Sequence, residues 1–437
     1  MKHIDRQILQ IALPSIVSNI TVPLLGLIDV AIVGHLGSPA YIGAIAVGGM
    51  LFNIIYWIFG FLRMGTSGMT SQAYGKRDLP EIVRLLMRSV GIGMAVALCL
   101  ILLQVPIRQA AFLIIHPTAE VREMATLYFH ICIWGAPAML GLYGLSGWFI
   151  GMQNSRIPMY IAITQNIVNI IASLSFVCFF KMKVEGVAFG TLIAQYAGFI
   201  MGLVLWMSRY GKLKKYILWK GVLQKEAMMR FFQVNRDIFL RTLCLVTVTL
   251  FFTSAGASQG EIILAVNTLL MQLFTLFSYV MDGFAYAGEA LSGRYIGARN
   301  RKAFTNTTRH LFIWGGWLAA FFTLVYALGG NAFLGLLTDN KDVVSAAGTY
   351  FYWALAIPVA GIAAFIWDGI FIGATATRGM LASMAIAAIC FFVVYYGLRP
   401  VLGNHALWLA FLVYLAMRGV VQTLLSPKII KENFTQP

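Results

Sequence analysis

The sequence predicts an all-α polytopic membrane protein in which twelve transmembrane helices form two pseudo-symmetric six-helix bundles around a central cavity. The prediction rests on the composition, on the number of apolar runs and on an internal repeat. Of the 437 residues, 60% are hydrophobic and 11% are charged, and the mean hydropathy is +0.81. Because a soluble domain carries about 25% charged residues, this apolar surplus indicates a chain that lies in a lipid bilayer.

About twelve apolar stretches are long enough to cross the bilayer, since a transmembrane helix needs ~20 residues. Backbone polar groups in lipid must be hydrogen-bonded within the segment, so runs of this length indicate helices. The expected spans are residues 8–33, 43–70, 89–114, 125–150, 158–180, 185–208, 232–254, 261–290, 307–334, 345–373, 379–396 and 403–425.

Basic residues collect in the even-numbered loops, after the second, sixth and eighth spans. The loop after the sixth span, for example, carries Lys212, Lys214, Lys215 and Lys220, whereas odd-numbered loops such as "HLGSPAY" are nearly neutral. The positive-inside rule therefore predicts that both termini lie in the cytoplasm. The same loops account for the net charge of +16, so we expect no nucleic-acid partner.

The chain repeats itself. "AVGGMLFNIIYWIFG" (46–60) resembles "AVNTLLMQLFTLFSY" (265–279), and "PAMLGLYGLSGWFIGMQNSR" (137–156) resembles "PVAGIAAFIWDGIFIGATATR" (358–378). Six spans separate the copies, so both copies have the same orientation, as in transporters whose two halves enclose a substrate site near the bilayer midplane. We therefore expect an N-terminal lobe at 1–208, a basic cytoplasmic linker at 209–231 and a C-terminal lobe at 232–437.

One carboxylate, Asp29, interrupts the first apolar run in "LLGLIDVAIVGHLG" (24–37). It lies about five residues before the outer end of its span, or ~8 Å deep at the helical rise. An ionised acid facing lipid there would cost a few kcal/mol, so the side chain must face protein or water. Because burial disfavours the charged form, Asp29 is our candidate for ion coupling. The alternative is a structural acid bonded to a neighbouring helix.

Three amides share one face of the fifth span, because Gln165, Asn166 and Asn169 stand at positions i, i+1 and i+4 in "ITQNIVNIIASL". Three amides are poorly placed against lipid, so this face should point into the bundle. We expect it to form part of a substrate or coupling network with Asp29. The alternative is that these amides only hold the helices together through interhelical hydrogen bonds.

The second half carries a different set of ionisable groups. Arg241 falls in the seventh span, Asp282 and Glu289 in the eighth, and Asp368 in the tenth. Similar predicted depths suggest a charge network in the C-terminal lobe, with Arg241 within ion-pair reach of Asp282 or Asp368. A purely structural ion pair is the alternative, and Glu289 is also compatible with a solvated position at the cytoplasmic boundary.

Three prolines are candidate hinges. Pro137 and Pro358 occupy equivalent positions of the two repeats, and Pro23 lies in the first span near Asp29. A proline inside a helix removes one hydrogen bond and kinks the helix. The paired kinks fit either hinges or fixed packing features.

No pattern in the chain points to an enzyme. "GKRD" lacks the phosphate-loop pattern, the six histidines are scattered, and the five cysteines lie in apolar stretches without C-x-x-C spacing. We therefore expect no cofactor, no metal site and no catalytic residue. Without an ATPase module, uphill transport must draw on an ion gradient, which supplies about 2.3 kcal/mol per charge per 100 mV.

Several segments resemble the multidrug and toxic compound extrusion (MATE) family. The start, "ALPSIVSNITVPLLGLIDVAIVGHLG", resembles that family's first helix, and "GTSGMTSQAYGKRD" and "AGEALSGRYIGARN" resemble the ends of its second and eighth helices. "KVEGVAFGTLIAQ" (183–195) and "DGIFIGATATRGM" (368–380) are similar to its DinF-like branch. The resemblance covers nearly the whole chain.

The resemblance implies twelve helices in two lobes and antiport of drugs or cations against H⁺ or Na⁺, with Asp29 as a coupling carboxylate. Related members carry an Asn and sometimes an acid on the fifth helix. Asn166 and Asn169 match the amide part, but the following "IIASLSFV" has no acid. Asp29 is then the expected proton carrier of the first lobe.

The sequence thus predicts a secondary active multidrug efflux transporter that exchanges H⁺, or Na⁺, for cationic amphiphilic drugs by alternating access. We expect a monomeric, multi-pass protein of the bacterial cytoplasmic (inner) membrane, with small cationic or amphiphilic molecules and the lipid bilayer as partners. A flippase for lipid-linked saccharides or peptidoglycan precursors is the main alternative, but it favours a basic cavity rather than an acid and amides. A channel or scaffold fits the tandem repeat and the buried acid less well.

Overall fold

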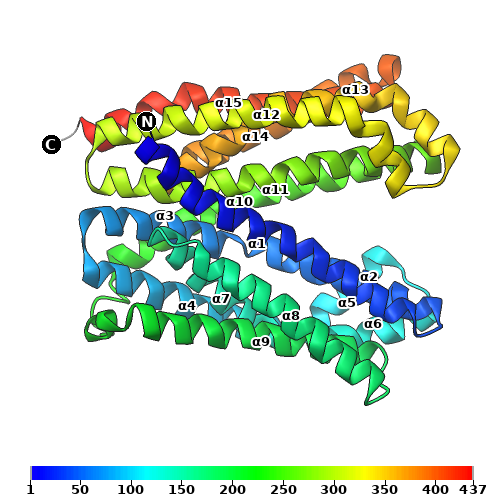
Figure 1. Ribbon diagram of the computed structural model, residues 1–437, viewed down its shortest axis with the longest axis horizontal. Helices are drawn as coiled ribbons and strands as arrows, with labels where there is room; N and C mark the ends of the chain where they lie inside the picture. Colours follow the sequence, from blue (N-terminus) through cyan, green and yellow to red (C-terminus); the bar gives the residue numbers. More distant parts are fainter. Residues whose placement is uncertain (1, 436–437) are drawn as a thin grey trace. The chain divides into compact units, whose positions relative to one another are not determined.

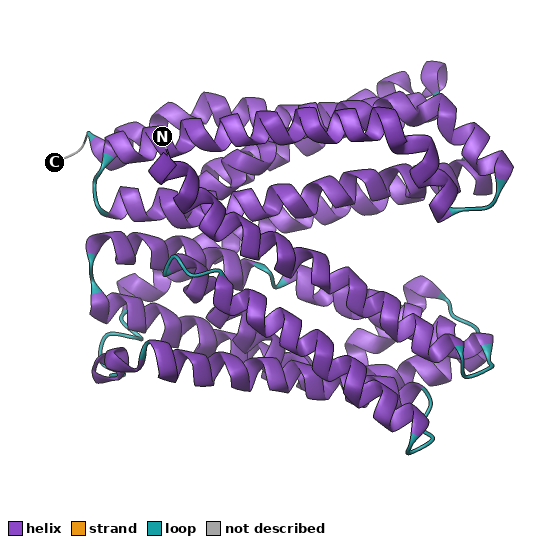
Figure 2. Ribbon diagram, in the orientation of Figure 1, coloured by secondary structure: helices purple, strands orange, loops and turns teal. Residues whose placement is uncertain are grey.

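The computed structural model describes residues 2–435, which are helical almost throughout and contain no strand (Figures 1 and 2). The α-helices are α1 (Lys2–Gly34), α2 (Pro39–Ile58), α3 (Phe61–Lys76), α4 (Leu79–Leu102), α5 (Gln104–Ile115), α6 (Ala119–Cys132), α7 (Ala136–Gly151), α8 (Arg156–Cys178), α9 (Val184–Arg209), α10 (Lys225–Ala257), α11 (Glu261–Gly297), α12 (Arg301–Leu337), α13 (Lys341–Gly373), α14 (Thr377–Leu402) and α15 (Asn404–Phe434). Short 3₁₀ helices occupy Ile133–Gly135 and Gly211–Tyr216.

Twelve helical segments of the described chain are long and apolar enough to cross a membrane, which confirms the predicted fold class. Two of the twelve are interrupted. The second consists of α2 and α3, which separate at Phe59 and Gly60, and the fourth consists of α6 and α7 with a 3₁₀ turn between them. Most segments extend beyond the predicted spans because their polar ends continue as helix.

The predicted third span, 89–114, is wrong in position. The structure has α4 at Leu79–Leu102 and a separate twelve-residue helix, α5, that is too short to cross. The helix begins early because Asp78 caps it, accepting a hydrogen bond from the Glu81 backbone N–H at 3.3 Å. Arg88 appeared to exclude the segment before it from the membrane, yet its side chain is buried and bonded to Glu81 and two backbone carbonyls.

By their contacts the described residues divide into two compact units. We call the unit of Val17–Phe232 the N unit, and the unit of residues up to Ile16 together with Gln233 onward the C unit. The division differs from the expected lobes 1–208 and 232–437 in the first sixteen residues and in the linker 209–231, which belongs to the N unit. The helix α1 therefore contributes residues to both units.

The internal repeat extends to the way each unit is packed. In the N unit a Cβ atom at Gly147 of α7 would overlap the backbone carbonyl of Arg63 on α3. In the C unit a Cβ atom at Gly369 of α13 would overlap the carbonyl of Ala285 on α11. Small residues let membrane helices approach this closely, so each unit uses a glycine in the same repeat position to bring two helices together.

A second pair of repeat-related glycines follows one turn later. A Cβ atom at Gly151 would lie 2.9 Å from the Ser67 carbonyl oxygen, and one at Gly373 would lie 2.5 Å from the Glu289 carbonyl oxygen. Ser67 and Glu289 therefore occupy equivalent places in the two units, although one side chain is neutral and the other is an acid. The repeat preserves backbone geometry while the buried side chains differ.

The predicted topology can be tested by labelling single cysteines introduced at Ser38, beside the start of α2, and at Ser258, between α10 and α11. We expect a membrane-impermeant maleimide to label both positions from outside intact cells, because both lie in odd-numbered loops. Labelling of either position only after the cytoplasmic side is opened would contradict cytoplasmic termini.

Candidate ion-coupling site and buried charge cluster

Asp29 is buried within the N unit, where its side chain is 6% exposed. Its Oδ1 atom is buried and has no hydrogen-bond partner among the described residues. The neighbouring apolar side chains Leu24 and Leu27 are exposed on the same helix, so the carboxylate faces protein while they face outward. A structural acid would be expected to hold a donor with both oxygens, which makes the free Oδ1 atom the notable feature of this site.

Aromatic side chains of α2 and α6 lie on the protein side of this acid. The Asp29 carboxylate interacts electrostatically with Tyr128 and Cys132 of α6. Phe52 of α2 packs against Tyr128 at a ring-centroid distance of 6.2 Å and against Phe129 at 5.1 Å. Sequence reasoning did not single out these residues, because aromatic side chains recur along every span and their spacing gives no sign of which ones meet.

Close packing of α2 on α6 places the Tyr128 ring. A Cβ atom at Gly48 of α2 would overlap this ring, so only glycine leaves room for it. Tyr56, one helical step from Phe52, stacks on that ring at 5.7 Å, and its buried hydroxyl has no partner among the described residues. The interior of the N unit therefore holds two polar oxygens without partners, on Asp29 and Tyr56, beside aromatic faces.

The three amides of the fifth span, now α8, point into the N unit but not to one target. Asn166 donates from Nδ2 to the Thr21 backbone carbonyl of α1 at 3.1 Å. Asn169 is fully buried and donates to the Thr191 hydroxyl of α9 at 3.3 Å, while Ser173 donates to its Oδ1 atom at 3.0 Å. No hydrogen bond from these two amides to Asp29 is formed.

The amides therefore separate by role. Asn169 ties α8 to α9, and Gln165 lies against Gly198 of α9, where a Cβ atom would overlap it. Asn166 instead reaches α1 two residues before Pro23 and eight before Asp29. Of the three amides, only Asn166 contacts the helix that carries the acid.

This separation gives a testable contrast between two isosteric substitutions on one helix. Asn166→Leu should slow efflux while changing the unfolding temperature little, because it removes a single partly exposed bond to α1. Asn169→Leu should lower stability by about 1–3 kcal/mol, because Thr191 and Ser173 lose a buried partner. Thermal unfolding and initial efflux rates of the two variants check this, and equal effects on both quantities would contradict the assignment.

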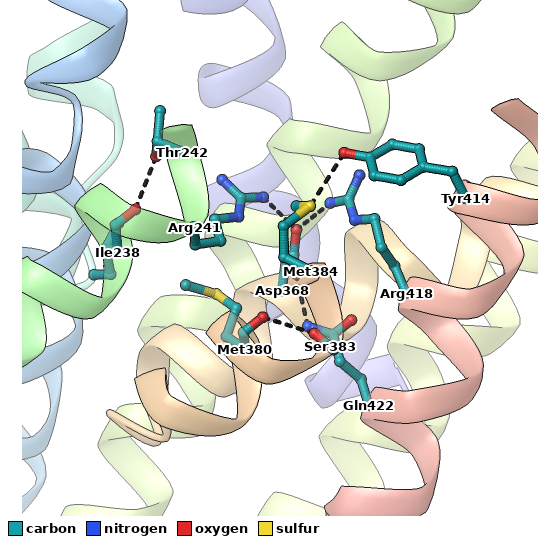
Figure 3. A network of polar contacts seen from close by, with 10 residues as sticks. All are labelled: Ile238, Arg241, Thr242, Asp368, Met380, Ser383, Met384, Tyr414, Arg418 and Gln422. Atoms are coloured by element: carbon teal, nitrogen blue, oxygen red, sulfur yellow. Dashed lines mark hydrogen bonds and ion pairs between the residues drawn. The ribbon is translucent and has the colours of Figure 1, made fainter. Parts of the chain in front are cut away.

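In the C unit, Asp368 of α13 is the centre of a buried charge cluster (Figure 3). Its Oδ2 atom accepts hydrogen bonds from Nη2 of Arg241 and from Nη2 of Arg418, each at 2.5 Å. Its Oδ1 atom accepts from Nε2 of Gln422 at 2.7 Å. The expected contact between Arg241 and Asp368 is therefore present, and α15 supplies the other two partners.

Arg418 and Gln422 were missed in the sequence although both lie in the predicted twelfth span. They stand four residues apart, which places them on one face of a helix, and this spacing in an apolar run was the available signal. With one carboxylate and two guanidinium groups, the cluster in Figure 3 keeps Asp368 ionised and occupies both of its oxygens.

The other two predicted members lie elsewhere in the C unit. Asp282 of α11 interacts electrostatically with Arg418, but the printed contacts of Asp368 do not include it. Glu289 is 1% exposed, which corrects the idea that it is solvated at the cytoplasmic boundary. Its backbone contacts α13 at Gly373. The cluster around Asp368 thus consists of Arg241, Arg418 and Gln422.

The three candidate hinge prolines differ in local structure. Pro137 stands near the start of α7, directly after the 3₁₀ turn that interrupts the fourth span. Pro358 lies within α13 and Pro23 within α1, and both helices continue through them. Only Pro137 coincides with a break, so equivalent positions in the repeat do not have equivalent backbones.

In residues 2–435 no group of three or more His, Cys, Asp or Glu side chains is placed to hold a metal ion. The polar groups of the two units therefore act as donors, acceptors and charges. What the N unit offers chemically is one buried carboxylate able to take up a cation, and what the C unit offers is a carboxylate already held by two arginines.

Comparison with known proteins places these features in a family. The MatE family model matches the chain twice, at residues 14–174 and 238–397, so each half carries one copy. The DNA damage-inducible protein F of Escherichia coli K12 is 39% identical over 420 residues, which cover 95% of this chain and 90% of that protein.

Solved structures agree in fold. A MATE crystal structure in the bent conformation superposes with a TM-score of 0.89 at 18% identity and covers 99% of this chain and 97% of its own. The Vibrio cholerae MATE transporter VcmN in its bent form gives 0.87 at 17% identity, with coverage of 99% and 98%. With a family model matched in both halves and a relative of this similarity, the chain belongs to the MatE family and is a multi-pass MATE transporter of the membrane.

Proposed function

We propose that this transporter is a secondary active multidrug exporter that exchanges H⁺, or Na⁺, for cationic amphiphilic molecules by alternating access. The observation that carries the proposal is the buried Asp29 carboxylate with an unpartnered oxygen. A carboxylate in this position attracts either a proton or an organic cation. Because it holds one charge at a time, the two guests exclude each other, which is the requirement for exchange.

The surroundings of Asp29 favour a proton over Na⁺ as the coupling ion. Hard metal cations bind through several oxygen ligands, whereas a proton needs one. The acid has no second carboxylate in a cluster with it among the described residues. The aromatic rings of Phe52 and Tyr128 beside it suit a flat organic cation, because ring faces attract cations.

The C unit does not supply a second coupling acid at Asp368. Both carboxylate oxygens are occupied and two guanidinium groups stabilise the charged form. The same cluster bears on the flippase alternative, which calls for basic groups facing an anionic guest. The two buried arginines are already committed to Asp368, so they support it little.

The location and assembly follow from the same reasoning. We infer a bacterial cytoplasmic (inner) membrane protein with both termini in the cytoplasm, acting as a monomer without cofactor. The internal repeat supplies two halves within one chain, as transporters with alternating access require.

Efflux of a fluorescent cation from inside-out vesicles tests the proposal, with pH and Na⁺ gradients imposed separately. We expect uphill dye movement under a pH gradient alone. One proton crossing ~100 mV supplies about 2.3 kcal/mol, enough for accumulation of tens-fold. Movement of the dye under neither gradient, with transport of a lipid-linked saccharide instead, would establish the flippase alternative.

A further inference from the structure

The helix that carries Asp29 is shared by the two units. Residues of α1 up to Ile16 belong to the C unit, whereas the residues from Val17 onward, including Asp29, belong to the N unit. We call these the inner and outer segments of α1. Among the described helices, α1 is thus one whose two ends are held by different units.

The inner segment is anchored to α12 by one carboxylate. Asp5 accepts at Oδ1 a hydrogen bond from Nδ1 of His310 at 2.9 Å and another from Nε1 of Trp314 at 3.1 Å. His310 and Trp314 stand four residues apart on the same face of α12. The Trp314 ring also stacks on Phe284 of α11 at 5.9 Å, so the anchor is fixed on two helices.

The inner segment is anchored to α11 at two further places. The Tyr295 hydroxyl donates to Oε1 of Gln7 at 2.6 Å. At Gly283 the backbones approach so closely that a Cβ atom would lie 2.9 Å from the Ala12 carbonyl oxygen and 3.2 Å from the Ile16 nitrogen. Ile8 and Ile11 are buried in the same interface. Hydrogen bonds and close packing therefore hold the inner segment along its length.

The outer segment is held more lightly. Val22 and Leu27 are each 67% exposed, and Asp29 and Val33 are the residues of this segment that are buried. The hydrogen bond from Asn166 to the Thr21 carbonyl is its side-chain link to α8. A helix with one firmly held end and one lightly held end moves at the light end when the charge there changes.

We propose that Asp5, His310, Trp314, Gln7 and Tyr295 are positioning residues that fix the inner segment of α1 to the C unit, so that ion exchange at Asp29 moves the outer segment against a fixed end. This inference rests on the proposed coupling role of Asp29. Asp5 and Asp29 are 24 residues apart, or ~36 Å along a helix. The continuous helix α1 is then the element that links protonation in one unit to the other unit.

Point substitutions separate this role from a general effect on folding. Asp5→Ala removes the acceptor shared by His310 and Trp314. We expect kcat for dye efflux to fall about tenfold while KM and proton release on dye binding stay within about twofold, since the guest still binds at Asp29. Asp5→Glu should restore part of the rate, because it keeps the acceptor.

Tyr326→Phe is the matched control. It removes a buried hydrogen bond of 2.6 Å from α12 to the Leu273 carbonyl of α11, without touching α1. We expect it to lower the unfolding temperature as much as Asp5→Ala does while leaving kcat near the wild-type value. A fall in kcat that simply follows the loss of stability in both variants would overturn the proposal.

Cross-linking tests whether the inner contact persists through the transport cycle. In a background whose five native cysteines are replaced and which still transports, the pair Gln7→Cys and Tyr295→Cys is joined by a bifunctional thiol reagent with a spacer. We expect the unlinked pair to transport slowly and the linked pair to recover. A link between Thr21→Cys and Asn166→Cys, which ties the outer segment to α8, should block efflux. A block by the inner link would overturn the proposal, because the contact would then have to open.

A measurement that does not depend on transport closes the test. Spin labels are placed within the C unit at Arg6 of α1 and Lys302 of α12, and within the N unit at Leu27 of α1 and Ile167 of α8. Asp29→Asn, which mimics the protonated acid, should change the Leu27–Ile167 distance distribution and leave the Arg6–Lys302 distribution unchanged. A change in the inner pair, or none in the outer pair, would overturn the anchor. Failure of the proposed function is seen separately, as wild-type protein without gradient-driven efflux.

Discussion

Asp29→Asn is expected to abolish gradient-driven efflux of a cationic dye while the protein still folds and reaches the membrane. The substitution keeps the size of the side chain but fixes it in the neutral state. The Oδ1 atom has no hydrogen-bond partner among the described residues, so no structural bond is lost at that atom. Without a proton to exchange, the dye can move only down its own gradient.

The measurement is efflux from vesicles under an imposed pH gradient, together with dye binding as a function of pH. We expect the rate to fall about tenfold or more and the pH dependence of binding to disappear, because the group that protons and dye share is gone. Asp29→Glu should keep partial activity, since the charge remains while its position shifts. Pumping at the wild-type rate by Asp29→Asn would show that Asp29 is structural and would direct attention to Asp282 and Glu289.

The double variant Arg241→Ala with Arg418→Ala is expected to be the least stable of the C-unit substitutions. Each arginine alone leaves Asp368 with one guanidinium partner, so either single variant should lose modestly. Removing both leaves a buried carboxylate without a counter-charge, which costs about 3–5 kcal/mol. Gln422 still donates to Oδ1, but a neutral amide compensates a charge only partly. Thermal unfolding in detergent should therefore show a loss in the double variant that exceeds the sum of the singles.

A third substitution provides the control. Asp368→Asn in the double-variant background removes the remaining charge and should recover much of the lost stability, because partners in one network are not additive. If the double variant is as stable as either single variant, the acid must find another cation, and the cluster drawn in Figure 3 would not explain the stability of the C unit. If efflux persists in a folded triple variant, Asp368 carries no part of ion coupling.

The number of spans and the family could be predicted from the sequence, because both depend on patterns along the chain. Long apolar runs must be helices in lipid whatever their neighbours are, and twelve segments of this kind are present. The repeat was visible because equivalent backbone positions need similar small residues, as at Gly147 and Gly369. Asp29 was singled out for the same kind of reason, since a lone acid in an apolar run is costly unless it is enclosed.

The partners of those residues could not be predicted, because they come from segments far apart in the chain. Arg241 and Arg418 meet on one carboxylate although 177 residues lie between their positions in the numbering. The amides of α8 shared a face in the sequence, yet one of them bonds α1 and another bonds α9. Burial of Arg88 by carbonyl groups likewise moved the start of α4 into a stretch that charge alone had excluded.

The sequence by itself thus determined that the chain crosses the membrane twelve times in two related halves and that Asp29 is enclosed. Local hydrophobicity and helix geometry are enough for both conclusions. Tertiary structure alone decided which carboxylate is left with an unpartnered oxygen and which is neutralised, and it divided α1 between two units. The physical reason is that a buried charge is governed by the donors around it, and those donors are brought to it by packing rather than by their place in the sequence.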